Sequence, residues 1–430
     1  MNFAQFVERV RTSIWFVPSL MTISAGLVAA LTLTLDASRR DLGIPAWLYD
    51  GSASSSRQIL ASLLASMVSV VGVVFSITIV ALSFSSQSLG PRLLRNFMRH
   101  RFLQGVVGSF TATLLFTLTI LASIDGNGPT AFVPLISVNL TLLATGGLVV
   151  LLIFFLHFVG ISISADHVIE ELEGAAQRTI ETEWPDFDSP GESGEEPVAD
   201  LDFPLEACIR ATCCGYVLEI DWDQLRHRVE EVHGVVDMKV RAGDYVATGQ
   251  EIATLRYRAP DFDPGELHRC VSLGPNRTES QDLEYRFHAI VEIAIRALSP
   301  GVNDPYTAIT CIDKLSSLLA NCAQRREPPH ELRDDSGGLR VVRKIADFSD
   351  LMAVAWNQLR QHARGDVAVT LRLMEAQERL ARLCRRGPRT RQIRRHAERI
   401  MENNLDSMPT RADERDLRIR LGRVRVALAG

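Results

Sequence analysis

Residues 59–83 read ILASLLASMVSVVGVVFSITIVALS, an unbroken apolar run that contains no charged side chain. A helix needs about 20 apolar residues to cross the hydrocarbon core of a bilayer. This run meets that length, and a buried helix of a globular protein is seldom so long and so uniformly apolar. The sequence therefore predicts a transmembrane helix here.

Three more runs of the same kind accompany it. They cover residues 14–35, 102–124 and 132–164, and none has Asp, Glu, Lys or Arg in its interior. Residues 1–164 are therefore expected to form a domain of four transmembrane helices in contact with the lipid bilayer.

Basic residues in the short connections predict the orientation of these helices. The connection between the second and third helices holds Arg92, Arg95, Arg99 and Arg101, whereas residues 125–131 hold no basic residue. Because positively charged loops stay in the cytoplasm, both termini are expected there, in a bacterial inner membrane. The four arginines alternate with apolar residues, which predicts an interfacial helix on anionic lipid head groups or a coupling element that contacts the soluble part.

Serines recur along one face of the second helix at steps of three, four and seven residues: Ser62, Ser66, Ser69, Ser76 and Ser83. Small hydroxyl side chains let helices approach closely and bond across them. They can also line a pore, which would require several copies of the chain around one axis. Helix packing and a pore wall both remain open as explanations.

His157 lies in the cytoplasmic half of the fourth predicted helix. Ionisable groups inside a bilayer are functional candidates, so a role in gating or proton handling is one hypothesis. The alternative is a neutral imidazole near the helix end, bonded to a hydroxyl such as Ser162 or Ser164.

The composition changes after residue 164. Residues 165–206 begin with a helical pattern and then become rich in Pro, Gly and acidic residues, which predicts a helical extension and a flexible acidic linker. Residues 207–258 contain β-prone runs around one short helix, which Asp221 is expected to cap. Their pattern V-x-x-G-D-x-V-x-x-G-Q-x-I resembles half of the barrel-sandwich fold of lipoyl and biotinyl carriers. Lys239 is not placed at a hairpin tip as in those carriers, so no such cofactor is expected.

The run ALSPGVNDPYTA, residues 297–308, lies between two predicted helices. The first is expected from Ser280 to Leu298, and Asp304 should cap the second. The run resembles the hallmark of a large, uncharacterised family of predicted bacterial membrane proteins, A-L-S-P-G-[IV]-N-D-P-[FY]-T-A. The resemblance extends to the membrane half, the G-D-x-V-x-x-G strands and the R-T-x-x-Q-D segment at residues 277–282. It implies an architecture and no particular activity.

The corner between these two helices is a candidate ligand or anion site. Ser299, Asn303 and Asp304 place oxygen atoms near the amides of a helix N-terminus, which can hold an anion, and Arg277 and Arg296 would assist if the fold brings them close. The alternative is a rigid turn, because Pro, Gly, Asn and Asp favour turns. No nucleophile–base pair, P-loop or metal-ligand spacing accompanies the corner, so neither an enzyme nor a metal site is expected.

Residues 259–430 are expected to form a helical cytoplasmic domain, rich in arginine toward its end. No aromatic residues interleave with these arginines, so nucleic acid is not expected as a partner. The predicted fold class is an α-helical membrane domain joined to an α+β region with a small β element. The leading hypothesis is an oligomeric channel or transport-like protein with a cytoplasmic regulatory domain. The rival is a membrane-anchored sensor or scaffold that binds a ligand or partner without conduction.

Overall fold

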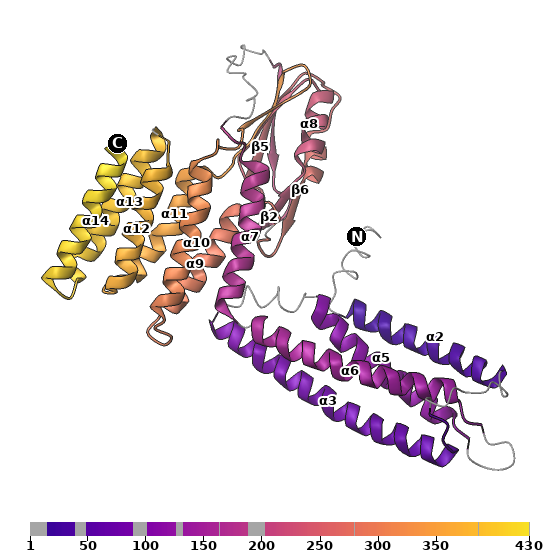
Figure 1. Cartoon of the computed structure of the whole chain (residues 1–430). Helices are drawn as coiled ribbons and strands as arrows, with labels where there is room; N and C mark the ends of the chain where they lie inside the picture. The colour runs from indigo at the N-terminus through magenta and orange to yellow at the C-terminus, as the bar shows by residue number, and fades with distance from the viewer. Residues whose placement is uncertain are drawn as a thin grey trace. The chain divides into compact units, whose positions relative to one another are not determined.

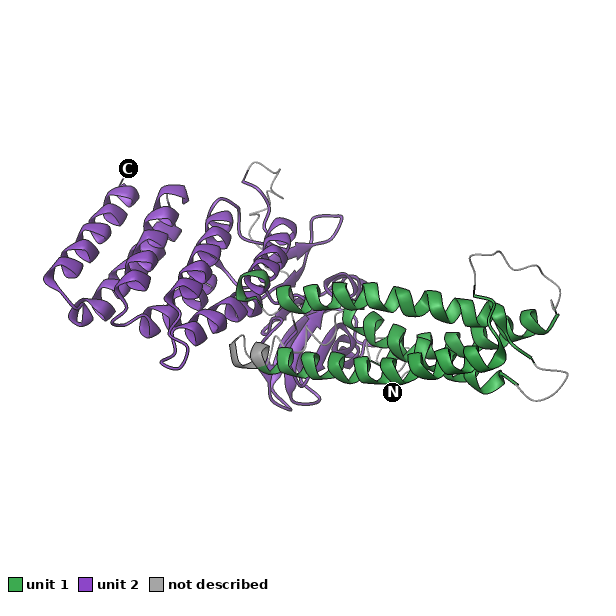
Figure 2. Cartoon of the chain, turned by 60° about the horizontal axis from the view of Figure 1, so that its bottom comes forward, with its two compact units in different colours: residues 1–167 green, residues 168–430 purple. Residues whose placement is uncertain are grey.

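The chain divides into two compact units, Met1–His167 and Val168–Gly430, which Figure 2 colours separately. Each unit has a buried apolar core of its own. The computed structural model describes residues 15–38, 49–88, 101–125, 132–162, 164–187, 203–278, 280–385 and 387–429.

Long apolar helices make up the described part of the first unit. They are α2 (Phe16–Ser38), α3 (Ala53–Ser88), α5 (Arg101–Ser123) and α6 (Leu135–Ser162), as Figure 1 shows. All four are long and apolar enough to cross a membrane. They coincide with the four predicted runs, except that α3 already begins at Ala53, because the polar residues before its apolar run continue the helix.

The helices of the first unit pack through two apolar clusters. α5 and α6 each contact both α2 and α3. Gly108 of α5 allows the close approach of α2: a Cβ atom there would lie 2.5 Å from the sulfur of Met21 and 3.2 Å from the Cα atom of Pro18. A side chain at position 108 would therefore push α2 and α5 apart.

A buried carboxylate ties the end of α2 to the start of α6. Asp36 accepts hydrogen bonds from the amides of Ile136 (2.9 Å) and Ser137 (3.1 Å) and from the Ser137 hydroxyl (2.7 Å). These amides belong to the first turn of a helix, where they have no partner within the helix. Asp36 thus caps a helix that begins a hundred residues later in the chain.

The helix α7 (Ala165–Glu183) follows α6 after two residues, and its packing lies in the second unit. One side chain per turn is buried: Ile169, Leu172, Ala176, Ile180 and, just after the helix, Trp184. This spacing gives a continuous apolar stripe along one side of α7.

Two small sheets form the β part of the second unit. The five-stranded sheet has the order β1-β5-β3-β8-β7, and the three-stranded sheet has the order β4-β2-β6. β3 and β8 pair in parallel, and the other pairs are antiparallel. The strands are β1 (Leu205–Arg210), β2 (Gly215–Ile220), β3 (Val235–Met238), β4 (Tyr245–Val246), β5 (Glu251–Tyr257), β6 (Val271–Gly274), β7 (Glu331–Arg333) and β8 (Leu339–Val342).

The β part extends beyond the boundary expected from the sequence. Three strands, β6, β7 and β8, lie after residue 258, in the region expected to be helical. They are only three or four residues long, and β8 pairs with β3 across about a hundred residues of chain. Such short strands form because of their pairing partners, so they are difficult to predict from their own sequence.

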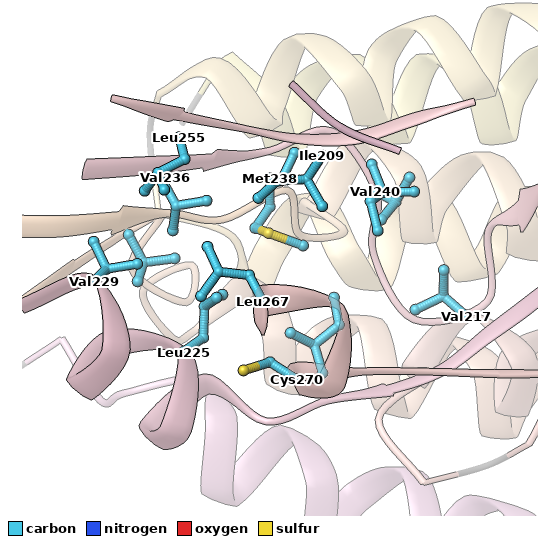
Figure 3. Close-up of a cluster of buried hydrophobic side chains, with 14 of the residues drawn as sticks. Ile209, Val217, Leu225, Val229, Val236, Met238, Val240, Leu255, Leu267 and Cys270 are labelled. Carbon is cyan, nitrogen blue, oxygen red and sulfur yellow. The ribbon is translucent and has the colours of Figure 1, made fainter. Parts of the chain in front are cut away.

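A shared apolar core holds the strands and the helices α8 (Trp222–Glu231) and η1 (Pro264–Cys270) together. Figure 3 shows Leu225 and Val229 of α8, together with Leu267 of η1, pointing toward Val236 and Met238 of β3. Asp221 caps α8 as the sequence predicts, because its carboxylate accepts the Gln224 amide at 2.9 Å.

Six helices of the second unit form a row in which successive members pack against one another (Figure 1), and β7 and β8 interrupt this row in the chain after its second helix. Asp282, Asp304, Asp347 and Asp366 each cap one of the first four. The helices are α9 (Leu283–Ala297), α10 (Pro305–Ala323), α11 (Phe348–His362), α12 (Val367–Leu383), α13 (Pro388–Asn404) and α14 (Arg411–Ala429).

Candidate functional site

A cavity of about 370 Å³ lies in the second unit where segments distant in sequence meet. The end of α7, the start of α8, the loop before β4, the start of α9 and residues 343–346 line it. Its volume is that of a small-molecule site. The charged side chains that line it are Glu183, Arg241, Asp282, Glu284, Arg343 and Lys344.

Arg241 lines this cavity and pairs with two carboxylates. Its guanidinium donates to Glu284 at 2.9 Å and to Asp350 at 2.7 Å, so one side chain joins the starts of α9 and α11. Its Nε atom is buried and has no hydrogen-bond partner among the described residues. A guanidinium has five donors in a fixed plane, and the described residues leave the buried Nε donor of Arg241 unused.

Gln281 and Asp282, at the end of the R-T-x-x-Q-D segment, form one wall of the cavity. The amide of Gln281 bonds both backbone groups of Ile220, at 3.0 Å each, and so attaches this wall to the end of β2. Asp282 caps α9 and forms an ion pair of 2.6 Å with Arg277. Gly243 fits above Asp282 with a φ of +90°, and a Cβ atom there would lie 2.1 Å from the Asp282 carboxylate. The structure therefore requires glycine at position 243.

Arg343 also lines the cavity and lies over the ring of Trp222, with 5.5 Å between the guanidinium carbon and the ring centre. Burial lowers the pKa of Arg343, and the nearby Glu183 carboxylate opposes this effect. Burial raises the pKa of Glu183, against the attraction of Arg343 and Arg286. Lys344 pairs with Asp244 at 2.8 Å and is the most exposed cation of the site.

The pKa values of three carboxyls that line the cavity are shifted in the same direction. Burial is the main cause that raises the pKa of Asp282 and of Glu284, as it does for Glu183. These carboxyls therefore take up protons at a higher pH than usual. The cavity becomes more positive as the pH falls, which favours an anionic ligand.

The serines of α3 and His157 of α6 lie on outward surfaces of the first unit. Ser62, Ser66, Ser69, Ser76, Ser83 and His157 are all exposed, so none of them packs between the four described helices. His157 makes no hydrogen bond within the described part of the chain, and the Ser162 side chain lies outside that part. Arg101 is exposed at the start of α5, while Arg92, Arg95 and Arg99 fall outside the described residues.

The residues predicted for the ALSPGVNDPYTA corner are only partly brought together. Ser299, Asn303 and Asp304 lie at the corner after α9, and Arg296 lies in the last turn of α9, 3.6 Å from Glu292. Arg277 lies before the other end of α9, about 22 Å away at 1.5 Å per residue, and pairs with Asp282, which lines the cavity. Asp304 already accepts the amides of Tyr306 and Thr307, so the first donors of α10 are occupied.

None of the residues that line the cavity is among the site residues predicted from the sequence, although Gln281 and Asp282 stand in the R-T-x-x-Q-D segment. Arg241, Glu284 and Arg343 come from separate segments, and no short motif joins them. The one available signal is Gly243, which the sequence explains equally well as part of a hairpin turn. No group of three or more His, Cys, Asp or Glu suited to a metal ion occurs among the described residues.

Four apolar helices of spanning length, followed by a large unit with its own core and a charged cavity, fit a multi-pass membrane protein with a large second unit. The chain belongs to the family described as Predicted membrane protein (DUF2254), whose match covers residues 11–379. The match includes the four described spans and the cavity, and it ends inside α12.

Relatives with curated sequences are known from mycobacteria. The Uncharacterized protein Mb1321c of Mycobacterium bovis is 27% identical over 389 residues, which is 88% of this chain and 73% of that protein. The Uncharacterized protein Rv1290c of Mycobacterium tuberculosis gives the same identity and the same shares. No solved structure matches the chain.

Proposed function

We propose that the protein is an oligomeric channel or transport-like protein of the bacterial inner membrane, with both termini in the cytoplasm and a ligand-binding regulatory unit. The observation that carries the proposal is the outward serine face of α3. In this proposal several copies of the chain place their α3 helices around one axis, and the serine hydroxyls face water or ions there.

The packing of α3 sets its serine face apart from its core face. The buried positions Leu60, Met67, Val74 and Ala81 recur every seven residues and contact the neighbouring helices. Met67 and Ser69 are two positions apart, which is about 200° around a helix of 3.6 residues per turn. Ser62, Ser76 and Ser83 stand in the same relation to Leu60, Val74 and Ala81, so these serines lie opposite to the side that packs within the chain, whereas Ser66 lies about 100° from Met67.

The serine hydroxyls of α3 bond within their own helix and can still accept a hydrogen bond from outside it. Ser66 donates to the Leu63 carbonyl at 2.8 Å, and Ser69 donates to the Ala65 carbonyl at 3.2 Å. Each hydroxyl proton is thereby used within the helix, while the oxygen can still accept a hydrogen bond or coordinate a cation. The same small surface would also permit close contact between subunits.

Two further outward features support an assembly of several chains. His157 is exposed on α6, and an imidazole that faces lipid is costly unless another group or water covers it. Gly72 of α3, together with Gly146 and Gly147 of α6, has no atom within 4 Å of the place where a Cβ atom would lie. The packing within one chain does not need these glycines, whereas helix contacts between chains favour them.

Flux measurements test this function. Purified protein in liposomes is expected to pass small ions, and Ser69→Leu or Ser76→Leu should reduce the flux by more than half. Ser24→Leu is a matched control, because Ser24 of α2 is also exposed and also bonds its own helix, at 2.7 Å from the Met21 carbonyl. Absence of flux under voltage, tension and changes of pH would refute conduction.

The second candidate is a membrane-anchored sensor or scaffold, which the charged cavity favours. Its ligand would bind to Arg241, Arg343 and Lys344 without any conduction. A monomer in detergent, silent liposomes and ligand-dependent stabilisation of the second unit would together support this candidate. Glu284→Gln should then strengthen the binding of an anion, because it removes one negative charge from the cavity wall.

A further inference from the structure

The helical corner Ser299–Tyr306 carries apolar side chains that nothing in the described chain covers. Val302 is 50% exposed and Tyr306 is 80% exposed, the highest value among the exposed large apolar side chains of the described residues. We propose that this corner is a membrane contact that places Val302 and Tyr306 in the lipid interface, beside the point where the chain leaves its last span.

The corner is rigid. The Ser299 carbonyl accepts the amides of Val302 at 3.0 Å and Asn303 at 2.9 Å, and the Ala297 carbonyl accepts the Asp304 amide at 2.8 Å. Asn303 has a φ of +50°, in the left-handed region that asparagine tolerates better than most residues. The two apolar side chains are therefore held outward by a fixed backbone, and their exposure is not that of a loose loop.

The position of the corner along α7 follows from two contacts between α7 and α10. Glu173 pairs with Lys314 at 2.7 Å, and the Trp184 carbonyl accepts Arg325 at 2.9 Å. Glu173 and Trp184 are eleven positions apart, and so are Lys314 and Arg325. The helices α7 and α10 therefore run in parallel and in register. Pro305 lies nine positions before Lys314, and Ser164 lies nine positions before Glu173. The start of α10 is therefore level with the start of α7.

A contact from α9 gives the same position independently. Arg286 donates to the Ala175 carbonyl at 2.8 Å and also bonds the Thr179 hydroxyl, so it is level with the middle of α7. α9 runs opposite to α10 and ends at Ala297, eleven positions after Arg286. That end is level with about Asp166, in the first turn of α7.

The first turn of α7 is next to the membrane in the chain itself. α6 ends at Ser162 and α7 begins at Ala165. Packed helices lie 8–10 Å apart, so the corner lies within roughly that distance of the first turn of α7. This estimate uses only contacts of α7 with α9 and α10.

The chemistry of the corner suits the lipid interface. Tyrosine gathers at the boundary between hydrocarbon and head groups, because its ring is apolar and its hydroxyl is polar. The charged side chains nearby are engaged within the protein: Asp304 caps α10, and Arg296 lies beside Glu292. Apolar insertion should therefore dominate, and the contact should depend little on the charge of the lipid.

Fluorescence quenching in the full-length protein tests the proposal. An environment-sensitive dye is attached at Val302→Cys or Tyr306→Cys, in a chain whose exposed cysteines Cys208, Cys213 and Cys214 are changed to serine. The protein is reconstituted in phosphatidylcholine vesicles, with and without phosphatidylglycerol, and lipids with a nitroxide at head-group depth serve as quenchers. Asp335→Cys, on an exposed turn of the same unit, is the matched control site.

The expected result is quenching at positions 302 and 306 that is several times stronger than at 335, with little difference between the two lipid compositions. Iodide in the water should show the reverse order. Equal lipid quenching at all three sites would overturn the proposal. So would protection of position 302 from both quenchers, which would mean a protein partner. Quenching that needs phosphatidylglycerol would instead indicate an anion site and would also overturn it.

Discussion

Arg241 is the side chain through which the cavity is assembled. It is mostly buried, and its two carboxylate partners belong to α9 and α11. A buried pair of this kind contributes little net stability when intact, but its loss is severe because the remaining charge is left without a partner. The site and the fold of the second unit thus depend on the same residue.

Replacing Arg241 should therefore destabilise the second unit strongly. Arg241→Ala is expected to lower the free energy of unfolding by about 3 kcal/mol, since Glu284 would stay buried without its cation. The measurement is urea unfolding of the full chain in detergent. Arg418→Ala is the control: it breaks the more exposed pair with Glu414, which should cost less than about 1 kcal/mol. Equal losses in the two variants would contradict this account of the cavity.

His396 should make the stability of the second unit depend on pH. It is buried in α13, and burial, with help from Arg399, Arg360 and Arg395, lowers its pKa from 6.5 to about 4. The unfolded chain takes up the proton near pH 6.5, whereas the folded chain does so only near pH 4. Stability that is present above pH 6.5 is therefore lost as the pH falls toward 4, by at most about 3 kcal/mol.

The variant His396→Leu should remove this part of the pH dependence. Unfolding of the native chain and of the variant is compared between pH 7 and pH 4, so that titration of other groups cancels in the difference. If the difference in unfolding free energy between the two chains stays constant over this range, His396 has the same pKa in the folded and unfolded chain, and the prediction is wrong.

Single residues differ in how far the sequence reveals their roles. Asp221 and Asp304 are predicted correctly as caps, because a cap acts on amides two or three positions away. The partners of Arg241 lie 43 and 109 positions away along the chain, and no local rule connects them. The cavity was thus beyond the reach of the sequence alone, although Asp282 and Gln281 stand in a recognised motif.

Among the helices, α7 links the packing of the second unit to the last span. Its buried stripe and its ion pair with α10 define one register between the two helices. The membrane-contact proposal rests on that register. It deserves a direct test in which only the ion pair is altered.

Reversal of the Glu173–Lys314 pair should be tolerated only when both residues are exchanged. Glu173→Lys places two cations together and is expected to destabilise the second unit by about 0.5–1 kcal/mol, which a lower melting temperature would show. The double variant Glu173→Lys with Lys314→Glu should recover most of this loss. Failure of the second change to compensate would argue against the pairing.

Gly108 should be necessary for the packing of α2 on α5. Gly108→Leu is expected to destabilise the first unit by about 1–3 kcal/mol, because its side chain would collide with Pro18 and Met21. Gly105→Leu is the matched control on the same helix, since no atom lies within 4 Å of its Cβ position. Thermal unfolding in detergent measures the stability of both variants. Equal losses of stability would contradict the close approach of α2 and α5 at Gly108.

The helices were easier to predict than the strands. The four spans and α8, α9 and α10 follow from apolar periodicity and caps, which are local properties. β7 and β8 have three and four residues, and β8 is held by a parallel partner far away in the sequence. Their existence depends on tertiary contacts, so the β region predicted from local patterns ends at residue 258, before these strands.

Taken whole, the described parts of the two units have separate apolar cores. Leu225 belongs to the core of the second unit, and Phe110 belongs to a cluster of the first. Units with separate cores can unfold separately, which determines how core variants should behave.

Core substitutions should act on one unit at a time. Leu225→Ala is expected to cost about 2–5 kcal/mol and to lower one calorimetric transition of the detergent-solubilised chain. Phe110→Ala should lower the other transition by a comparable amount. A shift of both transitions by either variant would mean that the two units unfold as one.

The buried stripe of α7 also decides where the chain can be cut for biochemical work. A fragment that begins at Phe203, with the first strand, would leave the apolar surface under Ile169, Leu172 and Ile180 open to water. Such a fragment should aggregate during expression, whereas one that begins at Ala165 should stay soluble. The helix that follows directly from the last span is therefore the first necessary piece of any water-soluble preparation of this protein.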